Sequence, residues 1–458
     1  MAASLGWKTF VRQVSLPESS LKSLWQRLPE RPPRVLLEGV RWQGQPWLYL
    51  GWDAARHWPG LDLPQLRRDI LGWRDGLVPR GTAGASRLQD LLGSVVGVLG
   101  HDALEPDPLT WDAGDDPSGA LFLPGRVLLW RPGAPAYLAV NLPLASATVS
   151  DPEMLLDRAE QQLAAQSHEG QPVPGNPRPP NAAPALKANW SLAEFSRAVT
   201  GVQAAIRSGS LSKAVLSLRF RVPYRGPAFP VFDRLRRSNP SSLMYLLDWG
   251  AWTLIGASPE PLVSKMGDHV SMRPLAGTRR RGATVEEDNR LTEALRSSAK
   301  DAAEHRIALD QAASDLAQVC LPGSVEAPEL LGIEVWPQVI HLASALQGTL
   351  APGRDAFDLL AACSPAATVV GAPRREALAL IHTLEPQPRG LYAGATLQVS
   401  PGGDLQSHII LRSLLLRGSA GYVQAGAGIV LESDPLEEYR ECLNKAKAAL
   451  AALGAGES

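Results

Sequence analysis

The sequence predicts an α/β protein of the α+β type, in which helices pack outside a large mixed β-sheet and a mainly β subdomain comes first. Three observations support this class. The chain has 458 residues, more than one hydrophobic core usually supports. Short apolar stretches separated by glycine, proline and charged residues fill its first part, as in a protein rich in strands. Helical and extended patterns alternate in its second part, which is typical of an α/β arrangement.

A proline-rich segment divides these two parts. Residues 169–186 read EGQPVPGNPRPPNAAPAL, and proline fixes φ and removes amide donors, so neither a helix nor a central strand continues through them. We therefore predict a mainly β subdomain over residues 1–168, a linker over 169–186 and a second domain over 187–458. The best helix candidates before the linker lie at 63–73 and 151–166.

The second domain opens with a helix that leads into a strand. Residues 191–209, SLAEFSRAVTGVQAAIRSG, have a serine cap, helical spacing of apolar residues and a terminating glycine. Residues 211–220, LSKAVLSLRF, alternate with period two and place Lys213 within a strand. Further helices are expected at 286–319 and 435–453, with strands at 243–256, 391–399 and 421–430.

Composition and charge exclude several classes of partner. The chain has 45 Lys and Arg residues against 46 Asp and Glu residues, so no global field attracts nucleic acid or an anionic bilayer. It has no apolar run long enough to span a bilayer, and residues 1–20 lack the apolar core of a secretory signal. Cys320, Cys363 and Cys442 lie far apart without C-x-x-C spacing, which argues against a disulfide framework or a thiolate metal site. We expect a soluble, cytoplasmic protein with reduced cysteines.

Two stretches of the second domain combine charged residues with glycine in ways that binding sites use. The segment SMRPLAGTRRRG, 271–282, joins a Pro-x-x-Gly turn to three arginines. Such a segment either holds a carboxylate or forms a basic turn exposed to solvent. Gly426 and Gly428 lie within a predicted strand, where glycine marks either a bulge or a close approach by a ligand or backbone.

Two predicted helices carry acidic residues with the same ambiguity. Glu304, in AEHRIALDQAASDL, is a surface charge or ion-pair partner on an ordinary helix. The helix after Ser433 places Glu438, Glu441 and Lys445 on one face. Such a face is compatible with a metal site and with a salt-bridge stripe.

Taken in their order along the chain, these stretches resemble the chorismate-utilising enzymes, and most closely component I of anthranilate synthase and of aminodeoxychorismate synthase. The resemblance rests on RPLAGTRRRG at 273–282, EH at 304–305, VIH ending at His341, TVVGAPR at 368–374, LYAGA at 391–395, ILRS at 410–413 and QAGAGIVLESDPLEEYRECLNKA at 424–446. It covers essentially the whole chain after the linker. It implies the fold of anthranilate synthase component I and a lyase of tryptophan or folate biosynthesis.

The resemblance also implies a substrate, chorismate, and a Mg2+ ion. The positions that match the family's metal-binding acids are Glu304, Glu438 and Glu441. The positions that match residues around the rest of the substrate are Arg412, Tyr392, Gly426, Gly428, Lys445, Ala276, Gly277 and Thr278. His341 and Thr368 match catalytic positions near the ring and its leaving hydroxyl, with a buried structural histidine as the alternative for His341.

The activity that the resemblance implies is amination of chorismate. Ammonia adds to the ring as the hydroxyl leaves, and the same site then eliminates pyruvate to give anthranilate. The ammonia ordinarily comes from a separate glutamine amidotransferase subunit. This chain has no cysteine in a nucleophile-elbow signature, Cys363 in AACSPA being the nearest, so we expect such a partner.

Lys213 favours a different reaction. Ammonia-using members of the family carry glutamine at this position, whereas isochorismate and salicylate synthases carry a lysine that activates water as a base. The resemblance places their general-acid glutamate just before the Pro-Leu-Ala-Gly turn, where this chain has Arg273. Ala276 stands where some aminodeoxychorismate synthases have a nucleophilic lysine. The alternatives are therefore aminodeoxychorismate synthase component I and an isochorismate synthase that uses Lys213.

Three departures from the family pattern leave a diverged, non-catalytic chorismate binder as a further alternative. The segment DQAASDL at 310–316 has Ala313 and Ser314 in place of arginine and asparagine, and the segment at 366–374 reads AATVVGAPR. The family's LLES segment, which is associated with tryptophan feedback, reads LLEG here, so Gly39 lacks the serine hydroxyl. We expect weak control by tryptophan.

Overall fold

The computed structural model describes residues 7–16, 20–42, 45–58, 67–68, 83–101, 103, 117–143, 151–164, 186–336 and 339–455. Of the predicted linker, only Leu186 falls within these ranges, and of the predicted helix at 63–73 only residues 67 and 68 do. The remainder of both segments lies outside the described residues.

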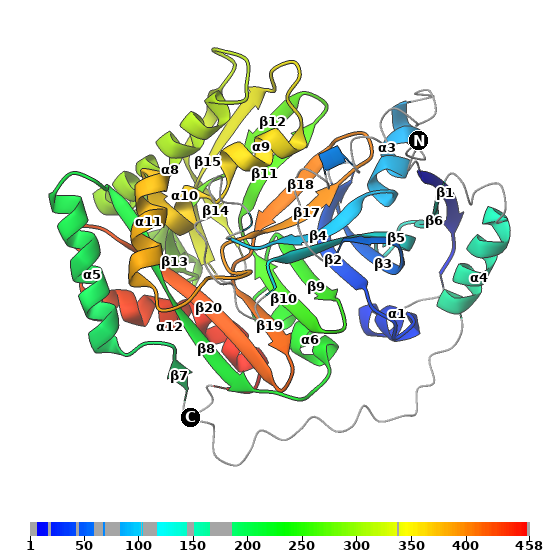
Figure 1. The fold of residues 1–458 in the computed structure, drawn as a ribbon, viewed down its shortest axis with the longest axis horizontal. Coiled ribbons are helices and arrows are strands. Elements are labelled where there is room, and N and C mark those ends of the chain that lie inside the picture. The colour runs from blue at the N-terminus through cyan, green and yellow to red at the C-terminus, as the bar shows by residue number, and fades with distance from the viewer. Residues whose placement is uncertain are drawn as a thin grey trace.

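One antiparallel network of strands forms the centre of the molecule (Figure 1). Its first arm leads through β1 (Trp7–Val14), β6 (Ala136–Pro143), β5 (Gly119–Trp130), β3 (Gln45–Trp58), β2 (Arg34–Trp42), β9 (Leu243–Asp248), β10 (Trp252–Ser258), β19 (Ser413–Arg417), β20 (Ala420–Ile429) and β8 (Lys213–Pro223). The outer edge of β8 holds two short strands, β16 (Gly371–Ala372) and β7 (Lys187–Ala188).

The second arm starts from the same strand, β5, whose first half pairs with β4 (Val95–Leu99). It continues through β17 (Ala395–Val399), β18 (Leu405–Ile409), β11 (Pro261–Met266), β12 (His269–Met272) and β15 (Val339–Thr349), and β13 (Leu275–Arg280) and β14 (Glu326–Val335) also pair with β15. The pairs β2–β9 and β4–β17 join strands from both sides of the predicted linker. The division into two domains stays a prediction.

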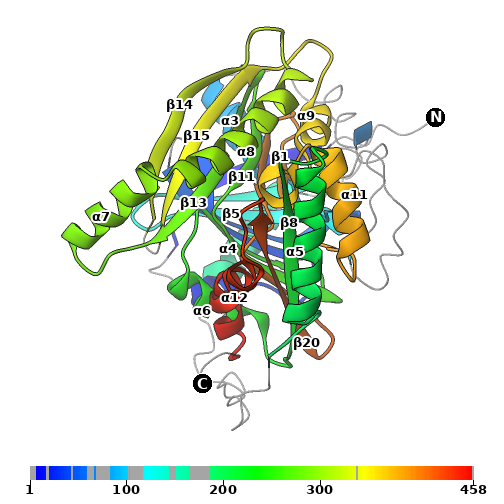
Figure 2. The same cartoon turned by 90° about the vertical axis from the view of Figure 1, so that its left-hand side faces the viewer.

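Helices cover the outside of this network, which confirms the predicted class (Figure 2). The helices α5 (Leu192–Arg207), α11 (Arg374–Leu384) and α12 (Pro435–Ala452) pack near β8 and β20. The others are α1 (Leu21–Arg27), α3 (Ala83–Leu92), α4 (Pro152–Ala164), α6 (Ala228–Ser238), α7 (Val285–Arg296), α8 (Ala299–Ala317), α9 (Ala356–Cys363) and α10 (Ala367–Val370).

Local sequence signals explain where several of these elements begin and end. Ser191 and Glu194 form a reciprocal capping box at the start of α5, as the serine cap predicts. The single helix predicted over 286–319 is wrong, because Ser298 accepts a hydrogen bond from the Asp301 amide and starts a second helix there. The predicted strand over 243–256 is a hairpin of β9 and β10, since Asp248 accepts a hydrogen bond from the Gly250 amide and stabilises a turn.

The core is continuous between the helices and the sheet. A main cluster of buried apolar side chains fills the space under α5, α6 and α12, and a second cluster lies around Tyr49, Phe122 and Tyr245. Cys320, Cys363 and Cys442 are free thiols in the interior, as predicted. Among the helices in the described ranges, none is long and apolar enough to cross a membrane.

Candidate active site

The predicted acidic residues approach one another from two helices that are distant in sequence. Glu304 lies on α8, whereas Glu438 and Glu441 lie on the first turns of α12. Glu438 is buried, and its Oε1 accepts a hydrogen bond of 2.8 Å from the Ser433 hydroxyl. Burial raises the pKa of Glu438, and the nearby carboxylates of Glu441 and Glu304 raise it further. The three glutamates therefore form one electrostatically coupled group.

A divalent cation fits this carboxylate group in charge and in donor chemistry. Carboxylate oxygens are the ligands that Mg2+ prefers, and a cation between them would relieve the repulsion that raises the pKa of Glu438. The three carboxylates do not form a coordination shell: across the described residues, no three His, Cys, Asp or Glu side chains are grouped to hold a metal ion. Glu304 instead contacts a lysine.

Lys213, on the sheet, contacts this acidic group. It is the first residue of β8, it is buried, and its Nζ donates a hydrogen bond of 3.0 Å to Glu304 Oε2. Gly428 on the neighbouring strand β20 leaves room for the lysine, because a Cβ atom there would overlap Lys213 Cε. The lysine in this strand is thus accommodated because its ammonium group pairs with an acid of α8.

Gly426 leaves room for a second polar group. A Cβ atom there would lie 2.7 Å from Tyr392 Oη, and the Gly426 carbonyl accepts a hydrogen bond of 3.0 Å from Lys445 Nζ. The pairing of β20 with β8 continues in register through both glycines, so the bulge is wrong, and the groups nearest to the two Cβ positions are the side chains of Tyr392 and Lys213. Close approach by a ligand stays a prediction. Lys445 also forms an i,i+4 ion pair with Glu441 at 2.6 Å, as a salt-bridge stripe predicts.

His341 on β15 lies beside the turn of β13. Its Nδ1 is 3.2 Å from the Gly277 carbonyl oxygen and 3.0 Å from Thr278 Oγ1, whereas its buried Nε2 has no hydrogen-bond partner among the described residues. A bulge at Gly277, with φ of +63°, separates Ala276 from Thr278 and directs the Gly277 carbonyl toward the ring. Burial lowers the pKa of His341 to about 4, so the imidazole is neutral near pH 7.

A neutral imidazole with Nδ1–H donated to a carbonyl leaves Nε2 as an acceptor. His341 is therefore suited to accept a hydrogen bond from a ligand hydroxyl, and it is poorly suited to donate a proton near neutral pH. Its orphaned nitrogen points to a ligand contact more than to a purely structural histidine.

The sequence pattern did not predict one acidic residue of this pocket, Glu260. It lies between β10 and β11, fully enclosed, and burial raises its pKa to about 7. The Thr368 hydroxyl, the Leu275 amide and the Arg412 guanidinium oppose this shift, which places all three groups around the carboxyl. Glu260 occurs in the turn SPEPL, where a glutamate looks like an ordinary surface residue, so no local signal identifies it.

Arg412 and Tyr392 complete the pocket. Arg412 precedes β19 with φ of +48°, and burial lowers the pKa of its guanidinium although the Glu260 carboxyl lies near. A cation in this environment is stabilised by a bound anion. Burial raises the pKa of Tyr392, so its phenol stays neutral. Arg412 also acts on His341, which links this part of the pocket to β15.

The arginines of the turn at 271–282 do not enter this pocket. Arg279, Arg280 and Arg281 pair with Asp301, Glu287 and Asp288 respectively, and Arg273 pairs with Glu329 and Glu334. They stabilise the lobe of β13, α7, α8 and β14. These four side chains therefore form ion pairs within the protein, and Arg280, with 67% of its side chain exposed, is solvated as a basic turn predicts. Binding of a substrate carboxylate by this turn stays a prediction.

The two altered segments of the second domain contact each other. Asp315, at the end of 310–316, forms a buried ion pair with Arg374, at the end of 366–374. Arg374 also donates hydrogen bonds to the carbonyls of Ala362 and Ser364. The structure thus retains a tight connection between α8 and the segment that carries Thr368.

Comparisons with known proteins identify the family of this chain. Residues 75–451 match the family model described as chorismate binding enzyme. Anthranilate synthase component 1 of Cereibacter sphaeroides is 39% identical over 263 residues, which are 57% of this chain and 53% of that protein. The same component of Aquifex aeolicus is 41% identical over 271 residues, 59% of this chain and 55% of that protein. The matched region spans about half the length of these relatives.

Solved structures give a similar result for the fold. Anthranilate synthase component I of Streptococcus pneumoniae superposes with a TM-score of 0.72 at 26% identity, covering 90% of this chain and 93% of that one. The menaquinone-specific isochorismate synthase of Escherichia coli has a TM-score of 0.76 at 21% identity, covering 98% and 95% of the two chains, and indicates the fold alone.

The fold of this chain is that of the anthranilate synthase component I structure. The family match extends over most of the chain. This protein belongs to the chorismate binding enzyme family.

Proposed function

We propose that this protein is an anthranilate synthase component I-like lyase, which converts chorismate and ammonia to anthranilate, pyruvate and water with the aid of Mg2+. The observation that carries the proposal is the electrostatic coupling of Glu438 with Glu304 and Glu441. Lys445 pairs with Glu441, and both Lys445 and Arg412 act on His341, so cations lie near these acids. A substrate with two carboxylates needs such a pocket, because one carboxylate can face a metal ion and the other can face cationic side chains.

The described side chains suggest a division of roles. Glu304, Glu438 and Glu441 would hold Mg2+, which supplies charge neutralisation for the carboxylate that it contacts. Arg412 and Lys445 would bind the other carboxylate, together with the Tyr392 hydroxyl. His341 would accept a hydrogen bond from the ring hydroxyl through Nε2, because that nitrogen is buried and lacks a partner among the described residues.

Glu260 and Thr368 would assist the departure of that hydroxyl. In the first step a C–N bond forms as the C–O bond to the ring hydroxyl breaks, and the hydroxyl must gain a proton to leave as water. A carboxyl with a pKa of about 7 is protonated in part at neutral pH and is therefore a suitable donor. In the second step the enolpyruvyl C–O bond breaks with loss of a ring proton, which yields pyruvate and the aromatic ring.

The nitrogen source is a further part of the proposal. The relatives at about 40% identity are named as component 1 of anthranilate synthase, which implies at least one other component. We propose that a glutamine amidotransferase subunit delivers ammonia to this chain. Free ammonium at high concentration should replace it in a purified system.

A product assay tests the proposal. Purified protein with chorismate, MgCl2 and ammonium sulfate at alkaline pH should give fluorescent anthranilate and an equal amount of pyruvate, and EDTA should stop both. Omission of ammonium separates amination from hydration, because isochorismate would form without a nitrogen source. A chain that forms isochorismate but no amino product would act through Lys213 as a water-activating base, and a chain that binds chorismate without turnover would be a non-catalytic binder. Release of an aminodeoxychorismate without pyruvate would show that the protein catalyses the amination step but not the elimination of pyruvate.

A further inference from the structure

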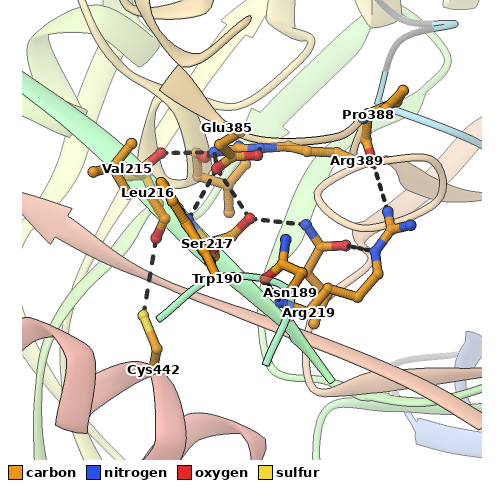
Figure 3. A network of polar contacts seen from close by, with 12 residues as sticks. Asn189, Trp190, Val215, Leu216, Ser217, Arg219, Glu385, Pro388, Arg389 and Cys442 are labelled. Atoms are coloured by element: carbon orange, nitrogen blue, oxygen red, sulfur yellow. Dashed lines mark hydrogen bonds and ion pairs between the residues drawn. The ribbon is translucent and has the colours of Figure 1, made fainter. Parts of the chain in front are cut away.

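Glu385 and Arg389 form a buried ion pair next to segments that carry residues of the proposed site (Figure 3). Both side chains are almost fully enclosed, with 3% and 2% of their surface exposed. Arg389 Nη2 donates to Glu385 Oε1 at 2.7 Å, and Arg389 Nε donates to Glu385 Oε2 at 3.0 Å. Neither residue belongs to the site described above, and both lie on the segment that connects α11 to Tyr392.

This pair replaces a missing strand at one edge of β8. The strand β20 covers one edge along its whole length, whereas β16 and β7 cover only residues 213–214 and 220–221 of the other edge. Between them, Arg389 Nη2 donates to the Val215 carbonyl at 2.6 Å, and Glu385 Oε1 accepts from the Ser217 amide at 2.9 Å. Side chains thus satisfy backbone groups that a neighbouring strand would otherwise pair.

Arg389 connects three segments that carry site residues. Its Nη1 donates to the Val369 carbonyl at 2.8 Å, next to Thr368 on α10. Its contact with Val215 lies two residues from Lys213, and its own main chain lies three residues before Tyr392, whose amide donates to the Arg389 carbonyl at 3.2 Å. The planar fork of arginine is what permits one side chain to hold two carbonyls and a carboxylate at fixed angles.

A serine and a glutamine extend this connection to β20. The Ser217 hydroxyl donates to Glu385 Oε1 at 3.0 Å and accepts from Gln424 Nε2 at 2.8 Å. Gln424 lies two residues before Gly426. Figure 3 shows Ser217 between the Glu385–Arg389 pair and the side chains from the adjoining segments.

We infer that Glu385 and Arg389 are positioning residues for the reaction: they set the distance of Lys213 from Thr368 and Tyr392 without touching the substrate. The inference rests on the proposed function, since it concerns the same pocket. Displacement of a reacting group by about 1 Å costs roughly 100-fold in rate, so a change in this ion pair should lower kcat. A pair that served only stability would leave kcat of the folded enzyme unchanged.

The test compares two variants of this network with two matched controls. Arg389→Lys keeps the charge but loses the planar fork, and Ser217→Ala removes one hydroxyl with little risk to folding. The control Asp248→Asn alters a different ion pair, which is partly buried and joins β2 to β9. In this pair Arg34 Nη2 lies 2.7 Å from Asp248 Oδ2. The control Ser407→Ala removes a buried strand serine that donates to the Val263 carbonyl at 2.6 Å.

We would measure kcat and KM for chorismate at saturating Mg2+ and ammonium, together with the thermal unfolding midpoint. Arg389→Lys should lower kcat roughly 10- to 100-fold and Ser217→Ala about three- to tenfold, with KM changed less than about threefold and kcat of both controls nearly unchanged. Arg389→Met should lose more than Arg389→Lys. Variants that lower the unfolding midpoint but keep kcat would overturn the inference. If Arg389→Lys does not fold, the kcat of Ser217→Ala tests the inference by itself. A wild-type protein without turnover would instead contradict the proposed function on which the inference rests.

Discussion

The Lys213 ammonium on β8 lies 3.0 Å from the Glu304 carboxylate on α8, and this ion pair connects the sheet to a helix that supplies one of the three proposed metal ligands. Because Glu304 already pairs with a cation, a metal ion that binds there must compete with Lys213. The pair therefore couples the proposed metal site to the lysine that would activate water in the alternative reaction.

Replacement of Lys213 should strengthen metal binding. Lys213→Gln removes a positive charge next to Glu304, so the Mg2+ concentration for half-maximal activity should fall about three- to tenfold, as expected for loss of one like charge at a partly screened site. Amination should persist, whereas any water adduct should disappear. A titration of activity with MgCl2 measures the effect, with the surface variant Lys187→Gln as the control. An unchanged Mg2+ dependence would show that the ion pair does not oppose the metal.

Loss of the buried acid on α12 should abolish catalysis. Glu438→Gln keeps the size and the Ser433 contact but removes the charge that the proposed metal site needs, so kcat/KM should fall by at least about 100-fold. Glu437→Gln is the matched control, because Glu437 is adjacent and exposed and should retain nearly full activity. Steady-state assays over a range of Mg2+ concentrations distinguish a weakened metal site, which excess Mg2+ restores in part, from a misfolded protein. Equal activity of the two variants would contradict the role of Glu438.

The buried carboxyl of Glu260 should make stability depend on pH. Its pKa in the folded protein, about 7, lies above the ordinary value of 4.5, so its contribution to stability is fully present below pH 4.5 and is lost as pH rises through 7. As the pH rises from 4.5 to above 7, the free energy of unfolding of the wild type should fall by about 3 kcal/mol at most, relative to that of Glu260→Gln. Chemical denaturation of both proteins at pH 5, 6, 7 and 8 measures this difference. A difference that stays constant over this range would exclude a raised pKa for Glu260.

The backbone at Gly39 should not accept a side chain. Gly39 has φ of +107°, and a Cβ atom would overlap the Ser242 carbonyl oxygen, so a serine side chain does not fit here. Gly39→Ala should lower the free energy of unfolding by about 3 kcal/mol or more. The control Gly133→Ala, with φ of +72° and open space around the Cβ position, should cost about 1 kcal/mol. Denaturant unfolding compares them; equal costs would contradict the overlap. Millimolar L-tryptophan should also leave the wild-type activity unchanged.

Patterns within one element were predictable from the sequence, because they depend on neighbouring residues. The cap and period of α5, the start of α12 at Pro435 and the strand that carries Lys213 follow from such local chemistry. The division of 286–319 into α7 and α8 was missed because Ser297 and Ser298 interrupt the helix without any glycine or proline.

Features that depend on distant contacts were not predictable. Glu260 is identified only by its burial beside Thr368 and Arg412, which come from segments more than 100 residues later. The roles of Glu385 and Arg389 depend on the gap between two short strands at the edge of β8. A sequence pattern does not contain that gap. The grouping of Glu304, Glu438 and Glu441 was predicted from the family resemblance, because the period and spacing of residues do not show which distant acids come close.

The most direct test of the proposed chemistry follows the nitrogen atom. Purified protein would be incubated with chorismate, MgCl2 and 15N-ammonium sulfate, and the products would be separated and weighed by mass spectrometry. A chorismate-aminating lyase gives anthranilate that carries one 15N atom and an equal amount of pyruvate, and none in the presence of EDTA. Recovery of unchanged chorismate, or of isochorismate as the sole product, would contradict amination by this pocket.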